Sequence, residues 1–172
     1  MNELAITVIG HDRPGIIADV AEILAGQGMN LTDSTMTRLR GHFAMTLVCV
    51  GNPDAVEVEA ALEPLTADGS LVATVRLVGP EADHGYTGGH YVVTVHGADK
   101  LGIVATVCRA VAEFGGNVTD LSTRLTGSLY VLVAEVDLPA PADVDSVRKR
   151  LDAVAGALGV EVALRPAEAD LL

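Results

Sequence analysis

Hydrophobic residues follow two alternating spacings along the chain, and the order of these spacings predicts the secondary structure. Segments 3–10 and 90–97 are short apolar runs rich in β-branched residues, which are typical of buried strands. After each run, apolar residues recur at the three- and four-residue spacing of an amphipathic helix. These residues are Ile16, Val20, Ile23 and Leu24 after the first run, and Val104, Val107, Val111 and Phe114 after the second.

A hairpin and a second helix are predicted after each of these helices. Segments 30–50 and 117–136 each predict two strands, which meet at Gly41 and at Gly127. The second helices are expected to begin at Asp54 and Asp143, whose side chains are good N-caps, and Pro64 is expected to shorten or kink the first of them. One apolar face is predicted on each helix, formed by Ala55, Val58, Leu62 and Leu65, and by Val144, Val147, Leu151, Val154 and Leu158.

Strand-like segments 71–79 and 160–166 close the two halves, so the order β-α-β-β-α-β occurs twice. This order predicts an α+β fold of two ferredoxin-like sandwiches in tandem, each an antiparallel sheet with helices on one face. We therefore predict one domain over residues 1–79 and a second over 90–172. The polar, glycine-rich segment 80–89 is interpreted as a linker.

The two halves also repeat in sequence, which indicates duplication. Residues 7–33 align without gaps with residues 94–120, and the turn "GHDRPGII" at 10–17 corresponds to "GADKLGIV" at 97–104. The helix exits "GMNLTD" and "GGNVTD" repeat as well. After deletion of one residue, the alignment places Arg38, Leu39 and Gly41 on Arg124, Leu125 and Gly127.

Charge and composition exclude several classes of function. The net charge is −12, and five scattered aromatic residues offer no stacking platform, so we expect no direct binding to nucleic acid or to anionic membranes. No apolar run is long enough to cross a bilayer, and the N-terminus lacks the basic region of a signal peptide. Cys49 and Cys108 are far apart and are predicted to be buried free thiols, which favours a cytoplasmic protein.

The repeated turn has the chemistry to bind a free amino acid. Gly15 and Gly102 permit close approach of a ligand, and the amides that follow lie at the positive end of a helix, which favours a carboxylate. Asp12 and Asp99 stand beside them and suit an ammonium group. An alternative interpretation is structural: these aspartates are simple N-caps, and Asn30 and Asn117 are ordinary turn residues.

The first copy, residues 8–50, resembles an ACT domain, with a D-R-P-G-I turn and a G-x-N exit from the helix, and the second copy follows it. The two-copy layout without an attached enzyme or DNA-binding domain is similar to the glycine cleavage system transcriptional repressor group. The resemblance implies amino-acid binding at interfaces between ACT units. The implied ligand contacts are Asp12, Arg13, Gly15, Ile16 and Asn30 in the first copy, and Asp99, Gly102, Ile103 and Asn117 in the second.

Two departures distinguish the copies from the family pattern. The second copy has Lys100 and Leu101 in place of Arg13 and Pro14, so its turn is less constrained, a departure that is compatible with a degenerate second site. Both copies have aspartate where many members have asparagine, which favours the ammonium end of a ligand over its carboxylate.

We accordingly expect a non-catalytic regulatory protein that binds an amino acid, glycine or serine being favoured, and controls a partner protein through ligand-dependent packing. A constitutive interaction module that binds an enzyme without a metabolite is the alternative. An enzyme using Asp12 and His11 ranks last, because no catalytic motif accompanies that pair. We expect no metal site at His84, His90 and His96, and we expect no cofactor. The sheet faces that the helices leave uncovered are expected to be apolar, which favours a homodimer.

Overall fold

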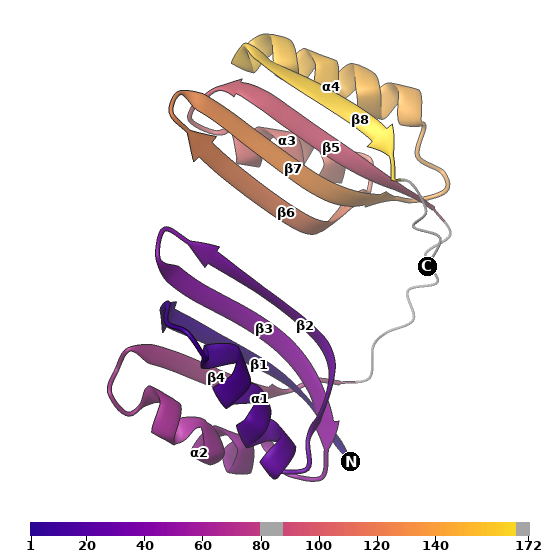
Figure 1. Cartoon of the computed structure of the whole chain (residues 1–172). Coiled ribbons are helices and arrows are strands. Elements are labelled where there is room, and N and C mark those ends of the chain that lie inside the picture. The colour runs from indigo at the N-terminus through magenta and orange to yellow at the C-terminus, as the bar shows by residue number, and fades with distance from the viewer. Residues whose placement is uncertain (80–87, 168–172) are drawn as a thin grey trace. The chain divides into compact units, whose positions relative to one another are not determined.

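The computed structural model describes residues 1–79 and 88–167, which form two compact units on either side of residues 80–87 (Figure 1). The first unit contains six elements in the predicted order. They are β1 (Asn2–His11), α1 (Ile16–Gly26), β2 (Asn30–Leu39), β3 (His42–Gly51), α2 (Ala55–Thr66) and β4 (Leu71–Leu77). All strand pairs are antiparallel, and the strand order across the sheet is β2-β3-β1-β4.

The second unit repeats this arrangement. Its elements are β5 (Gly89–Ala98), α3 (Ile103–Ala112), β6 (Asn117–Thr126), β7 (Leu129–Leu138), α4 (Val144–Leu158) and β8 (Val160–Pro166). The sheet order is β6-β7-β5-β8, again antiparallel. The predicted fold class, two ferredoxin-like βαββαβ sandwiches in tandem, is confirmed. Of the predicted linker 80–89, residues 80–87 lie outside the described residues, and Gly89 already belongs to β5.

Each core lies between one face of the sheet and its two helices, which cover that face in Figure 1. Side chains alternate across a strand, so Leu4, Ile6 and Val8 of β1 are buried on the helix side while the residues between them face away. Asp54 forms a capping box with Glu57 at the start of α2, as expected. Asp143 caps α4, and Pro64 lies in the last turn of α2.

The buried stripe of α3 differs from the prediction at two positions. Val104 is 37% exposed, and Phe114 lies beyond the end of the helix, where it packs against the core only in part. The stripe consists of Ile103, Val107, Ala110 and Val111. Ile103 takes the inward position at the helix start, so the neighbouring Val104 is turned about 100° away from the sheet.

The register of the hairpins corrects the one-residue deletion in the sequence alignment. Leu39 pairs with His42 in the first unit, and Thr126 pairs with Leu129 in the second, so both hairpins have two-residue turns. The equivalence of residues 87 positions apart therefore continues through β2 and β6. Arg38 pairs with Phe43 of β3, which in turn pairs with Gly10 of β1. Leu125 occupies the same position in the second unit, because it pairs with Tyr130 of β7, which pairs with Gly97 of β5.

Arg124 is one residue away from the position that the alignment assigned to it. Successive side chains of a strand point to opposite faces, so a shift of one residue exchanges the two faces. Arg124 therefore occupies the register position of Thr37, on the face of the sheet away from the helices. The second unit has no arginine at the position of Arg38.

Candidate ligand-binding site

The turn between the first strand and the first helix has the same backbone in both units. Gly15 and Gly102 precede α1 and α3 with φ of 89° in each case, a left-handed conformation that strains any residue with a side chain. No side chain caps either helix. The structural interpretation of Asp12 and Asp99 as N-caps is therefore wrong, and the first-turn amides of both helices lack a side-chain acceptor among the described residues.

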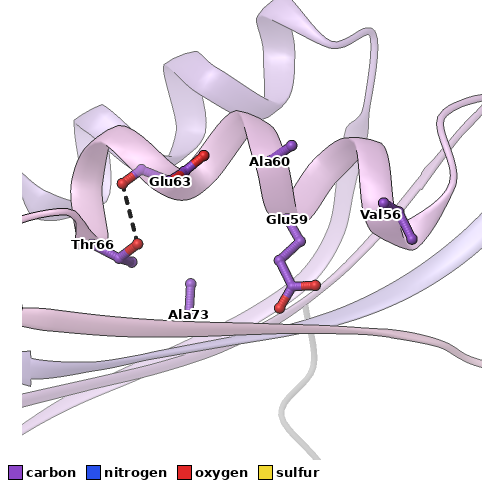
Figure 2. A pocket seen from close by; sticks show the side chains of 6 residues that line it. All are labelled: Val56, Glu59, Ala60, Glu63, Thr66 and Ala73. Carbon is purple, nitrogen blue, oxygen red and sulfur yellow. Dashed lines mark hydrogen bonds between the residues drawn. The ribbon is translucent and has the colours of Figure 1, made fainter.

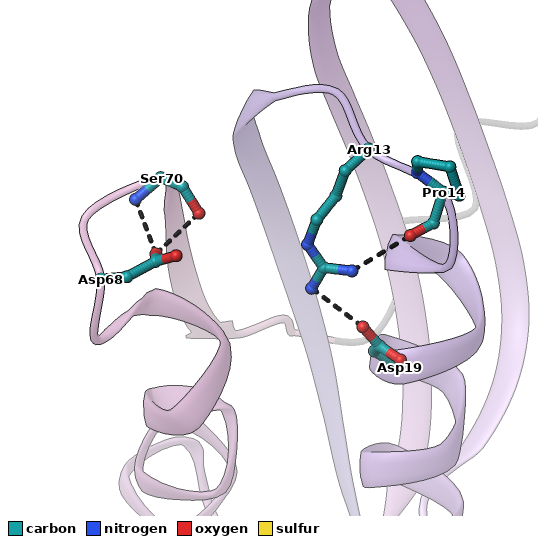
Figure 3. A network of polar contacts seen from close by, with 5 residues as sticks. All are labelled: Arg13, Pro14, Asp19, Asp68 and Ser70. Carbon is teal, nitrogen blue, oxygen red and sulfur yellow. Dashed lines mark hydrogen bonds and ion pairs between the residues drawn. The ribbon is translucent and has the colours of Figure 1, made fainter.

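In the first unit, arginine side chains neutralise the acidic groups of the turn. Arg13 Nη2 lies 2.9 Å from Asp19 Oδ2, and Arg13 Nη1 donates to the carbonyl oxygen of Pro14 at 3.2 Å (Figure 3). Arg38 Nη1, on the edge strand β2, lies 3.4 Å from Asp12 Oδ2. The carboxylate predicted to hold a ligand ammonium thus already has a cationic partner.

Backbone contacts fix the same turn to the rest of the first sheet. The amide of His11 donates to the carbonyl of Ser70 at 3.0 Å, and the amide of Asp12 donates to the carbonyl of Gly41 at 3.1 Å. Next to this contact, the hydroxyl and the amide of Ser70 donate to Asp68 (Figure 3) and hold the pKa of that carboxyl below its usual value. Both main-chain and side-chain contacts therefore hold the turn of the first unit in place.

In the second unit, the corresponding turn is free of these ion pairs. Thr106 replaces Asp19, and Leu125 replaces Arg38 in the strand register. Asp99 is exposed and forms no hydrogen bond or ion pair with any described residue. Lys100 extends toward Gly159, the residue that ends α4, where a cation is favoured by the helix dipole.

A cavity of about 380 Å³ opens at this second turn. It brings together three of the predicted contacts, Asp99, Gly102 and Ile103, but not Asn117. Sequence reasoning did not identify Tyr130 as a lining residue; it comes from β7, and the pairing of Tyr130 with Gly97 is what places it there. The lining residues are Asp99, Lys100, Leu101, Gly102, Ile103, Val104, Ala105 and Tyr130.

The asparagines at the helix exits lie far from the turn of their own unit. Asn30 pairs with Val50, which also pairs with Glu3, near the start of β1, whereas Asp12 follows the end of that strand. From Glu3 to His11 is about 26 Å at the rise of an extended strand. The structure thus places Asn30 away from Asp12, and Asn117 away from Asp99, within one unit. Their contact with a ligand, which the resemblance placed across an interface, stays a prediction.

Histidines form local pairs in both units. The rings of His11 and His42 stack with centroids 5.6 Å apart beside a cavity of about 460 Å³ at the ends of β1 and β3. In the second unit, His90 is bonded to Asp137, and His96 Nε2 lies 2.7 Å from Glu161. His84 lies outside the described residues. Within residues 1–79 and 88–167, no three potential metal ligands converge.

Comparison with known proteins places both units in one family. A family model described as "ACT domain" matches residues 2–76 and 90–165. A UPF0237 protein of Methanopyrus kandleri is 40% identical over 72 residues, which cover 41% of this chain and 80% of that protein. A UPF0237 protein of Streptococcus pneumoniae is 32% identical over 76 residues, covering 44% of this chain and 86% of that protein.

Two solved structures match nearly the whole chain. A protein described as an "unknown protein" from Galdieria sulphuraria has a TM-score of 0.80 and 27% identity, with coverage of 96% of this chain and 98% of the other. A protein described as a "putative glycine cleavage system transcriptional repressor" has a TM-score of 0.75 and 25% identity, with 98% of both chains covered. No helix in the described ranges is long and apolar enough to span a membrane. Matched over both of its units, this chain belongs to the ACT-domain family.

Proposed function

We propose that this chain is a non-catalytic regulatory protein that binds a free amino acid at the turn between β5 and α3. The observation that supports the proposal is the exposed carboxylate of Asp99, which has no partner among the described residues and lies in one cavity with the uncapped start of α3. Family membership and the repressor-like neighbour support a small-molecule-binding regulatory role in general terms.

The two ends of an α-amino acid match the two poles of this cavity. The ammonium group would pair with Asp99, and the carboxylate would accept hydrogen bonds from the first-turn amides of α3 near Val104 and Ala105. The helix dipole adds to the attraction of the carboxylate. In this pose the ligand ammonium, which pairs with Asp99, offsets the repulsion between Asp99 and the ligand carboxylate.

The first unit would contribute differently. Asp12 is engaged by Arg38, and Arg13 lies next to Gly15 at the start of α1, so an amino acid would have to displace both guanidinium groups. Binding there would lose part of its free energy to breaking these contacts. We therefore assign ligand binding to the second unit and a structural role to the turn of the first, with Arg13, Gly15 and Ile16 holding the start of α1.

Regulation would follow from the effect of the ligand on association. An amino acid can shift an equilibrium between two assemblies only by the difference in its affinity for them. A small ligand in an open cavity gains affinity when a second surface covers it, so binding would favour the covered state. A homodimer or a complex with a partner protein would provide that surface, and Asn30 or Asn117 of a neighbouring unit would be a suitable contact. Glycine and serine stay the favoured ligands, because the repressor-like neighbour is named for the glycine cleavage system.

Thermal unfolding of the full chain in the presence of each of the twenty amino acids tests the proposal. A ligand at 100 times its Kd stabilises by about 2.7 kcal/mol, which shifts the Tm of a unit of this size by several degrees. We expect Asp99→Ala to abolish the shift and Asp12→Ala to retain it. A chain that no amino acid stabilises, but that captures the same partner with and without amino acids, would instead be a constitutive interaction module.

A further inference from the structure

A second surface of the first unit, the groove between α2 and the edge strand β4, has features of a peptide-binding site. The groove encloses about 310 Å³ and is lined by Val56, Glu59, Ala60, Glu63, Thr66 and Ala73 (Figure 2). Ala73 points from β4 toward the helix, and Glu59 extends from α2 toward the strand. The floor is therefore small and apolar, and one wall is acidic.

The strand beside the groove is open for pairing. Among the described strands, β4 is bonded only to β1, so the backbone groups along its other edge have no strand partner. Proteins commonly block such edges with proline, lysine or a bulge. The sequence of β4, "LVATVRL", has no proline or lysine, and its pairing with β1 runs without a bulge. Its one charged residue, Arg76, lies on the face of the sheet opposite to Ala73 and to the groove. An extended segment of another chain can add to such an edge through main-chain hydrogen bonds.

The negative charge of the groove favours a basic peptide. Helix α2 contains three glutamates and no basic residue. Neither Glu59 nor Glu63 forms an ion pair with any described residue, so both carboxylates are available to a cation from outside the unit. Val56, which is 73% exposed, adds an apolar contact at the mouth of the groove.

The corresponding place in the second unit is lined by different side chains. Helices α2 and α4 both begin at a capping aspartate, and this matches Glu59 with Arg148. Arg148 is paired with Asp145 at 3.2 Å, so that wall is neutralised within its own helix. The strand register matches Ala73 with the larger Val162. Asp152 takes the position of Glu63, so the second unit keeps one of the two free carboxylates. The pair of free carboxylates beside a small floor is thus a property of the first unit.

We infer that the groove between α2 and β4 binds a basic, extended segment of a partner protein, which adds to β4 as a further strand and places lysine or arginine side chains against Glu59 and Glu63. This inference is independent of the amino-acid site, because the groove lies in the first unit and shares no residue with the turn at Asp99. It assigns the partner a stated chemistry: a strand in which basic side chains alternate with small or β-branched ones.

Fluorescence anisotropy with the full chain tests the inference, with a labelled peptide in which lysine alternates with valine as the probe. We expect saturable binding at physiological salt, and an affinity at least about tenfold lower for Glu59→Gln/Glu63→Gln. The matched control Glu22→Gln/Asp152→Asn removes the same number of charges from exposed positions on α1 and α4, and we expect less than about a twofold change from the loss of such remote charges. A peptide of equal charge with proline at alternate positions cannot form a strand pair and should not bind.

A further variant changes the shape of the groove without changing its charge. Ala73→Val fills the floor with the residue that the second unit already accommodates, and it is expected to weaken peptide binding while the chain stays folded. Hydrogen exchange should show slower amide exchange at residues 71–77, and not at 160–166, when the peptide is bound. No binding, equal losses in the groove and control variants, or equal binding of the proline peptide would each overturn the inference.

Discussion

Arg38 Nη1 on the edge strand β2 lies 3.4 Å from Asp12 Oδ2 in the turn after β1, and the matched position in the second unit is Leu125. This one difference, arginine in the first unit and leucine in the second, gives Asp12 a cationic partner and leaves Asp99 without one. Because the backbone of the two turns is the same, the difference between the two candidate sites lies in side chains contributed by the edge strand and the helix.

Exchange of these two residues should exchange the properties of the two turns. We expect Leu125→Arg to pair with Asp99 and to weaken amino-acid binding about tenfold, the value of roughly one charge-assisted contact. Arg38→Leu should free Asp12. Arg124→Leu, at the neighbouring register position on the other face, is the control and should leave the affinity unchanged. Titration calorimetry measures each affinity, and an equal loss with Arg124→Leu would contradict the register argument.

Gly10 and Gly97 provide a matched pair for testing close packing beside the turns. Their φ angles are 156° and 159°, so backbone strain on substitution is similar. A Cβ at Gly10 would lie 2.1 Å from the carbonyl oxygen of Ser70, whereas one at Gly97 would meet the side chain of Val160 at 2.9 Å. A side chain can move more easily than the backbone, so Gly10→Ala should cost about 3 kcal/mol or more and Gly97→Ala about 1–3 kcal/mol. Urea unfolding followed by circular dichroism measures both, and a larger loss in Gly97→Ala would contradict this ranking.

The ion pair between α3 and α4 makes a pH-dependent contribution to the stability of the second unit. Arg150 Nε lies 2.7 Å from Glu113 Oε2, and hydrogen bonding to Arg150 lowers the pKa of Glu113. A carboxyl with a lowered folded-state pKa stabilises the fold above its unfolded pKa of about 4.3 and loses this contribution as the pH falls through the folded value. Glu113→Gln should therefore be less stable than the parent chain at pH 7, and the gap should close in acid. Arg148→Gln, which affects a pair within one helix, should show a smaller gap, and a gap for Glu113→Gln that persists at pH 2 would contradict the assignment.

Both cysteines should react slowly with thiol reagents in the folded chain. Cys49 is fully buried, Cys108 is partly buried, and burial raises the pKa of each thiol. Because the thiolate is the reactive form, we expect labelling by a disulfide reagent at pH 7.5 to be at least about tenfold slower than in urea, with Cys108 modified before Cys49. Cys108→Ser should remove the faster phase, and its persistence in that variant would contradict the order.

The order of elements was predictable from sequence because it depends on local patterns. The apolar spacing of β1 and α1, and the capping aspartates Asp54 and Asp143, act within a few residues of chain, and duplication gave each pattern twice. The position of Gly15 and Gly102 before the helices was equally predictable, since a left-handed turn there requires glycine. These features follow from backbone sterics and side-chain burial, which neighbouring residues largely determine.

The properties of the site depended on pairing between distant strands, which the linear pattern does not specify. Sequence alignment matched Arg124 with Arg38, but the two-residue turns and the buried faces of β3 and β7 fix a register that matches Leu125 with Arg38. In a strand, one residue of shift moves a side chain to the other face, so alignment of similar letters is a poor guide to which charges meet. The sequence by itself determined the two sandwiches and the two glycine turns. The tertiary structure decided which aspartate is paired, because only the hydrogen-bonded register of the sheet brings residues 26 positions apart, such as Asp12 and Arg38, into contact.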